Sequence, residues 1–116
     1  MKPQAEVAHV AFWDVPFMLA ASKNRSFRES QLLLAEAVAA VFTERGLCTS
    51  DWSDLFQKAP ESFRVVIGDL TPEGFALVPT FQRWLANVDR WTAPRTREKL
   101  TSSLRNLIDE HQGTSA

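Results

Sequence analysis

The sequence predicts one α+β domain, predominantly helical, with about four helices and a small β-hairpin or a pair of short strands. Three observations lead to this class. Apolar residues recur at helical spacing over 27–45, 72–91 and 97–111. One short β-branched run, FRVVI at 63–67, has the composition of a strand. The length of 116 residues, with eight Phe and four Trp, suits one core, so we expect residues 1–116 to form a single domain.

The N-terminal segment allows a strand followed by a short helix. Residues 6–13 can be read as a strand, and Asp14-Val15-Pro16 can start a helix that runs through residue 21. Asp14 lies among apolar residues, and a carboxylate needs a partner if it is buried. Capping the first turn of the short helix would satisfy it. We expect residues 1–5 and 112–116 to be frayed.

The segment 27–45 is predicted to be the central helix. Ser26 and Glu29 have the spacing of a capping box, and Gly46 stands where a C′ glycine adopts a positive φ. Its large apolar residues cover more than one stripe of the helix, which is typical of a buried helix. These residues are Leu32, Leu33, Leu34, Val38, Val41 and Phe42.

The segment 48–58 has two possible structures. Asp51 can cap a short helix that runs through residue 58, or residues 47–52 can form a strand. In a helix, Asp51 and Asp54 share one face. Such a pair is either an acid–base pair, an acidic lip on a binding surface or, more commonly, a solvated first turn.

Two helices are predicted after the FRVVI strand. Thr71 and Pro72 are good N-cap and N1 residues, so a helix begins near 72 and continues to about 91. Pro79 either kinks this helix or divides it in two. Pro94 then stops it, and Thr96 can cap a last helix over 97–111. The apolar residues of that last helix form one narrow stripe, namely Leu100, Leu104, Leu107 and Ile108.

An arginine–tryptophan doublet occurs twice in the predicted helix over 72–91. Arg83-Trp84 recurs as Arg90-Trp91, about two helical turns later. One interpretation is an amphipathic helix whose Trp side faces the core and whose Arg side is solvated. The other is an interface at the helix end, because Trp and Arg are enriched at interface hot spots. The residues predicted to bind a partner are Arg83, Arg90, Trp91, Arg95 and Arg97.

Composition argues against several function classes. A net charge of −1 gives no general attraction to nucleic acid or to an anionic membrane. One cysteine cannot form an internal disulfide, which fits a reducing compartment. No apolar run is long enough for a membrane span, and the start lacks a signal-peptide pattern. We therefore expect a cytoplasmic protein with no membrane association.

Catalytic and metal-binding patterns are weak. His9 and His111 lie far apart in the sequence, and neither has a nearby ligand at helical spacing, so no metal site is expected. Cys48 has no local helper and is interpreted as a buried, inert thiol. Phosphate loops, dinucleotide fingerprints and nucleophile elbows are missing from the sequence. We expect no cofactor and no enzymatic activity.

A stretch of about 45 residues resembles the second half of bacterial winged-helix domains. The shared order is a helix ending in Glu44-Arg45-Gly46-Leu47, a possible strand, the Phe63–Ile67 strand, and Leu70-Thr71-Pro72-Glu73-Gly74 opening another helix. The resemblance implies a β-wing between the two helices and places 27–45 in the recognition position. DNA contacts would then come from Arg25, Arg28, Ser30, Gln31 and the basic segment 90–99.

The function predicted from these observations is a small non-enzymatic protein-binding module. It would act by occluding a partner protein, as an inhibitor, a toxin-neutralising immunity protein or an adaptor does. The alternative is a winged-helix-like DNA-binding transcriptional regulator, with nucleic acid as the partner. A homodimer is also possible, because an apolar helix face can be buried within one chain or between two copies.

Overall fold

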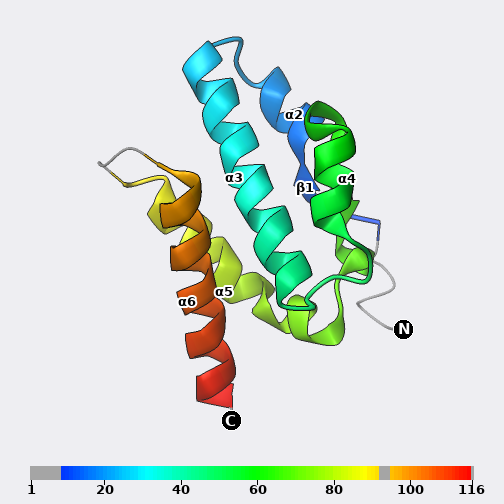
Figure 1. Cartoon of the computed structure of the whole chain (residues 1–116), viewed down its shortest axis with the longest axis vertical. Coiled ribbons are helices and arrows are strands. Elements are labelled where there is room, and N and C mark those ends of the chain that lie inside the picture. The colour runs from blue at the N-terminus through cyan, green and yellow to red at the C-terminus, as the bar shows by residue number, and fades with distance from the viewer. Residues whose placement is uncertain (1–8, 92–94, 116) are drawn as a thin grey trace.

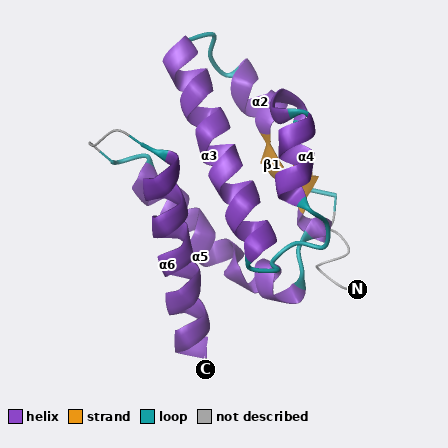
Figure 2. Ribbon diagram, viewed as in Figure 1, coloured by secondary structure: helices purple, strands orange, loops and turns teal. Residues whose placement is uncertain are grey.

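A computed structural model describes residues 9–91 and 95–115 of the chain (Figures 1 and 2). In this part the elements follow in the order β1 (Ala11–Asp14), α2 (Val15–Ala20), α3 (Arg25–Glu44), α4 (Trp52–Lys58), β2 (Arg64–Val66), α5 (Pro72–Val88) and α6 (Arg97–Ser115). Single turns of 3-10 helix lie at Pro60–Ser62 and Ile67–Asp69. The predicted class, a predominantly helical α+β domain, is confirmed.

Helix α3 is the central helix, as predicted. Seven of its residues are buried, and α2, α4 and α6 all pack against it (Figure 1). It begins two residues before the predicted start, because the Asn24 side chain accepts a hydrogen bond from the Phe27 amide at 3.0 Å. The prediction that Ser26 is the N-cap is therefore wrong, and Glu29 forms an ion pair with Arg25 instead of closing a capping box. Gly46 does end the helix with a φ of 66°.

The two strands form an antiparallel pair between distant parts of the chain. Asp14 lies opposite Arg64 and Trp13 opposite Val65, with an irregularity between Ala11 and Trp13. The predicted strand over 6–13 is thus shifted to 11–14, and residues 6–8 lie outside the described part. Because β2 pairs with β1 and not with a neighbouring strand, the β-wing implied by the winged-helix resemblance is not formed by the described residues.

The segment between α3 and β2 forms a short helix and not a strand. The Asp51 side chain accepts from the Asp54 amide at 2.9 Å and caps α4. The strand alternative for 47–52 is reduced to a single bridge between Cys48 and Leu70. Asp51 and Asp54 are both exposed, and Asp54 pairs with Lys58 at 2.9 Å, as expected for a solvated pair, whereas Trp52 of the same turn is buried.

Helix α5 begins where the sequence predicts. The Thr71 hydroxyl accepts from the Gly74 amide at 3.2 Å, and Pro72 occupies the first turn. Pro79 lies inside one continuous helix, with its side chain exposed, and the helix ends at Val88, before the predicted end near 91. A Cβ at Gly74 would clash with the backbone carbonyl oxygen of Leu47, so only glycine fits this contact.

Helix α6 runs alongside α3 in the same direction, while α5 runs the opposite way (Figure 1). The Thr96 hydroxyl accepts from the Lys99 amide at 3.1 Å, which confirms the predicted cap. Leu100, Leu104 and Ile108 are completely buried, so the narrow stripe is the core-facing side. The helix continues to Ser115, past the predicted end at residue 111.

Aromatic side chains fill the core between these elements. Phe42 of α3 stacks on Trp52 of α4 with ring centroids 5.5 Å apart. Phe81 of α5 stacks on Trp84 at 5.7 Å and on Phe12 of β1 at 5.2 Å. One continuous aromatic cluster therefore joins β1 to α3, α4 and α5.

Candidate partner-binding surfaces

The first arginine–tryptophan pair belongs to the core on its Trp side. Trp84 is 5 % exposed, and its indole Nε1 donates to the Ser103 hydroxyl of α6 at 2.9 Å. Arg83 is exposed and reaches the Thr80 hydroxyl of its own helix at 3.3 Å. The interpretation of α5 as an amphipathic helix with a core-facing Trp side holds for Trp84.

The second pair lies where α5 ends. Trp91 is half-buried and packs against the core, with its backbone amide bonded to the Val88 carbonyl at 3.0 Å. Arg90 is exposed, and within residues 9–91 and 95–115 no hydrogen bond or ion pair involves its guanidinium. Trp91 is therefore only partly accessible to solvent, whereas Arg90 is exposed.

Arg95 connects three helices from within the protein. Its side chain is 20 % exposed, and its guanidinium donates to the Ser30 hydroxyl of α3 at 3.2 Å. It also donates to the Val88 carbonyl and to the Asp89 carboxylate, both at 3.4 Å. A guanidinium with these partners fixes the position of α6 relative to α3 and α5, and little of it remains for an external partner.

Arg97 belongs to a row of ion pairs between α3 and α6. Its Nε lies 3.2 Å from the Glu36 carboxylate of α3. Of the five predicted binding residues, the structure thus leaves Arg83, Arg90 and Arg97 exposed, with Arg97 also paired to Glu36, and half-buries Trp91 and Arg95.

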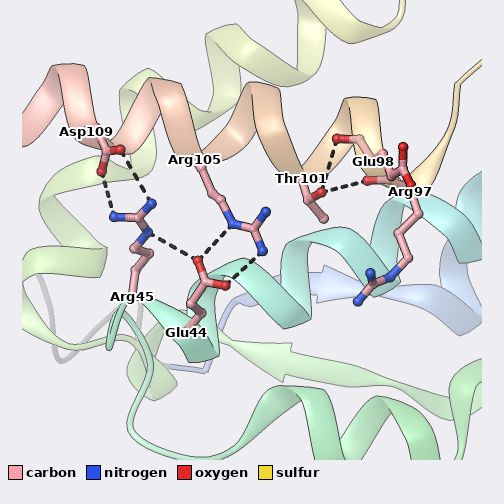
Figure 3. A network of polar contacts seen from close by, with 7 residues as sticks. All are labelled: Glu44, Arg45, Arg97, Glu98, Thr101, Arg105 and Asp109. Atoms are coloured by element: carbon pink, nitrogen blue, oxygen red, sulfur yellow. Dashed lines mark hydrogen bonds and ion pairs between the residues drawn. The ribbon is translucent and has the colours of Figure 1, made fainter.

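The other end of the α3–α6 contact carries four charged groups (Figure 3). The Arg105 guanidinium donates two hydrogen bonds to the Glu44 carboxylate, at 2.9 and 2.8 Å. Arg45 reaches Asp109 at 2.7 Å and also lies 3.4 Å from Glu44. The hydrogen bond from Arg105 lowers the pKa of Glu44, and neighbouring positive charge acts in the same direction. These charges pair with one another across the helix contact, which gives them a structural role.

The sequence interpretation missed Phe17. All twelve aromatic residues lie in the described part, and eleven of them are buried or half-buried. Phe17 is 77 % exposed on α2. The signal was present, because Val15 and Leu19 are four residues apart and both buried, and Phe17 midway between them must lie on the opposite side of the helix.

Helix α2 is short, yet contacts with other elements of the domain hold it in place. One oxygen of Asp14 accepts from the Phe17 amide at 3.0 Å, and the other accepts from Arg64 of β2 at 3.2 Å. The Val15 amide donates to the Phe63 carbonyl at 3.0 Å. The predicted capping role of Asp14 is confirmed, and the exposed phenyl ring rests on an anchored backbone.

The remaining candidates for chemistry are weak in the structure as well. The Cys48 thiol is half-buried and donates to the Ser50 carbonyl at 3.2 Å, and burial raises its pKa, which disfavours a reactive thiolate. His9 is exposed near the start of the described residues. Within residues 9–91 and 95–115, no three histidine, cysteine or acidic side chains come together as metal ligands would.

No protein-family model, curated protein or solved structure matches this chain. Among the helices in the described part, none combines the length and the apolar content that crossing a bilayer requires. The candidate surfaces therefore have to be judged by their own geometry.

Proposed function

We propose that the protein is a small protein-binding module that presents Phe17 as an anchor to a partner protein. The observation that carries this proposal is the exposure of Phe17, at 77 %, in a chain that buries or half-buries every other aromatic ring. The partner would supply an apolar pocket for one phenyl ring. Occlusion of that partner, as by an inhibitor, an immunity protein or an adaptor, is the corresponding mode of action.

An exposed aromatic ring on an ordered helix suits this role. Burying a Phe side chain is worth about 1.5–3 kcal/mol. A ring with few rotatable bonds on a fixed backbone also loses little conformational entropy on binding. Pro16 and Ala20 are exposed on the same short helix and add a small apolar margin around the ring.

The exposed arginines on α5 and just after its end form a second candidate surface. Arg83 lies on α5 and Arg90 lies in the turn after its end at Val88; both are exposed, and Arg90 has no partner among the described residues. Trp91 contributes only the exposed part of its ring. This surface would meet acidic groups of a partner, and its binding would weaken as salt increases.

DNA binding, the alternative function, has less support among the same residues. Arg25 pairs with Glu29, and Arg28 donates to the Leu19 carbonyl at 2.9 Å. Arg95 and Arg97 are engaged between helices, and α3 is the core helix and not a solvent-facing recognition helix. We therefore favour a protein partner, with DNA binding and self-association as measurable alternatives.

The experiment is a quantitative pull-down from native lysate with three matched baits at low and high salt. The baits are the wild-type chain, Phe17→Ser and the double variant Arg83→Ser/Arg90→Ser. We expect one stoichiometric protein on the wild type and on the arginine variant, retained at high salt and lost from Phe17→Ser.

Other outcomes discriminate between the surfaces. Loss of the partner only from the arginine variant would move the site to α5 and overturn the assignment to Phe17. Nucleic acid recovered at low salt and released at high salt would favour the DNA-binding alternative. A dimer of the bait that dissociates in Phe17→Ser would identify a second copy as the occupant.

A further inference from the structure

Helix α2 is too short to be stable by itself. It contains six residues, and isolated helices below roughly 12–15 residues are marginal in water. Its order must therefore come from contacts with the remainder of the domain. Val15 and Leu19 supply part of these contacts by packing in the core, and polar contacts act at the two ends, where groups without helical partners lie.

At its N-terminal end the contact runs through Asp14 to Arg64. The Asp14 carboxylate uses one oxygen to cap the Phe17 amide and the other to accept from Arg64 Nε at 3.2 Å. Asp14 and Arg64 are also directly opposed in the strand pair. The guanidinium therefore fixes the orientation of the carboxylate that caps α2.

At its C-terminal end the contact comes from α3. Arg28 donates to the backbone carbonyl of Leu19 at 2.9 Å, and its other nitrogen lies 3.8 Å from the Glu61 carboxylate. A cation at the C-terminal end of a helix satisfies an unpaired carbonyl and matches the negative end of the helix dipole. The two arginines thus reach α2 from different elements, Arg28 from α3 and Arg64 from β2.

We propose that Arg28 and Arg64 are positioning residues for Phe17. By holding the two ends of α2, they present the phenyl ring in one orientation before any partner binds. This inference rests on the proposed function for its purpose, but the ordering of α2 by the two arginines is a property of the free protein. Arg28 and Arg64 need not touch the partner.

The test is native-state hydrogen exchange on the free full-length chain, read at the backbone amides from Phe17 to Ala21. The test variant is Arg28→Met/Arg64→Met, which keeps apolar stems and removes both guanidinium groups. The control is Arg25→Met, because Arg25 lies one turn earlier on α3, is 91 % exposed and pairs only with Glu29 in the described part. We expect exchange from α2 to rise by about tenfold or more in the double variant.

Three further observations complete the test. Exchange of the buried α3 amides around Val38 and Phe42 should stay unchanged, which separates local loosening of α2 from global destabilisation. Two single variants that keep Arg64 are compared next. The α2 amides should be better protected from exchange in Arg28→Lys, which keeps a charged donor, than in Arg28→Met. Unchanged exchange from α2 in the double variant would overturn the inference.

Failure of the proposed function gives a different result. If the exchange from α2 rises as expected but Phe17→Ser binds the partner as the wild type does, the positioning of α2 is right and the anchor is wrong. If Phe17→Ser loses the partner and the double variant keeps both its affinity and its α2 protection, the anchor is right and the positioning role is overturned.

Discussion

Two regions of this molecule combine arginines with an aromatic ring, and they use the combination in opposite ways. Around α2, Arg28 and Arg64 bind backbone and carboxylate groups and leave Phe17 facing solvent. Where α5 meets α6, Arg95 joins three segments and the neighbouring Trp91 packs against the core. The same residue types thus present a ring in one region and secure helices in the other.

The difference bears on which property marks a candidate binding residue. The Arg-Trp doublet attracts attention in the sequence, but Trp84 is buried in the core. The half-buried Arg95, which follows the doublet, has three acceptors within the protein and little capacity left for a partner. Phe17 stands in an unremarkable stretch, yet its exposure combines with an anchored backbone. An exposed side chain without partners in the protein, on an ordered backbone, is therefore a better indicator of a candidate binding residue than residue type alone.

The largest effect is expected from removing a ring that secures the core. Trp84→Ala should lower the free energy of unfolding by about 3–5 kcal/mol, because it leaves a cavity beside Phe81 and an unpaired Ser103. Urea unfolding followed by far-ultraviolet circular dichroism would measure it. Trp84→Phe, which keeps a stacked ring, should lose clearly less, and a loss below about 1 kcal/mol in Trp84→Ala would contradict the core role of this tryptophan.

An intermediate effect is expected at Arg95. Arg95→Met should lower the free energy of unfolding by about 1–3 kcal/mol, since the change leaves the Val88 carbonyl and the Ser30 hydroxyl without this donor. The matched control Arg90→Met should stay within about 0.5 kcal/mol of the wild type. Equal stability losses in the two variants would remove the distinction drawn between these arginines.

The smallest effect is expected at Glu44, in the loss of folding stability at acidic pH. Because Arg105 lowers the pKa of Glu44 in the folded protein, this carboxylate stabilises the fold above its ordinary pKa, and the contribution disappears as the pH falls through the lowered value. Glu44→Gln should therefore be slightly less stable at neutral pH and lose less stability on acidification. Arg105→Met should show the same flattened profile in pH-dependent thermal unfolding, and the double variant should add nothing further.

A profile in Glu44→Gln that parallels the wild type down to the acid transition would contradict this assignment. The ion pairs between α3 and α6 would then contribute to geometry and not to the pH dependence of stability.

The helices and their caps were largely predictable because their causes are local. Thr71 and Thr96 cap the helices that the sequence assigned to them, and Gly46 ends α3 with a positive φ. The displaced cap at Asn24 is an error of two positions between two residue types that cap equally well. Such choices depend on the path by which the chain enters the helix.

The strand pairing and the fate of the candidate site were not predictable in the same way. β1 and β2 are separated by the whole of α3 and α4, and no local pattern specifies which strands meet. The partners of Arg95 and Arg97, which are Ser30 and Glu36, are more than fifty residues away in the sequence. The exposure of Phe17 could have been inferred from Val15 and Leu19 once the short helix was assumed.

The parallel packing of α6 on α3 also bears on how the protein is made. Helix α3 leaves the ribosome well before α6, so the apolar surface that Leu100, Leu104 and Ile108 cover waits for its last layer during synthesis. At about 5–20 residues per second the interval lasts several seconds, which is long compared with the collapse of a chain. Over that interval the uncovered apolar surface of the nascent chain is a candidate for chaperone binding.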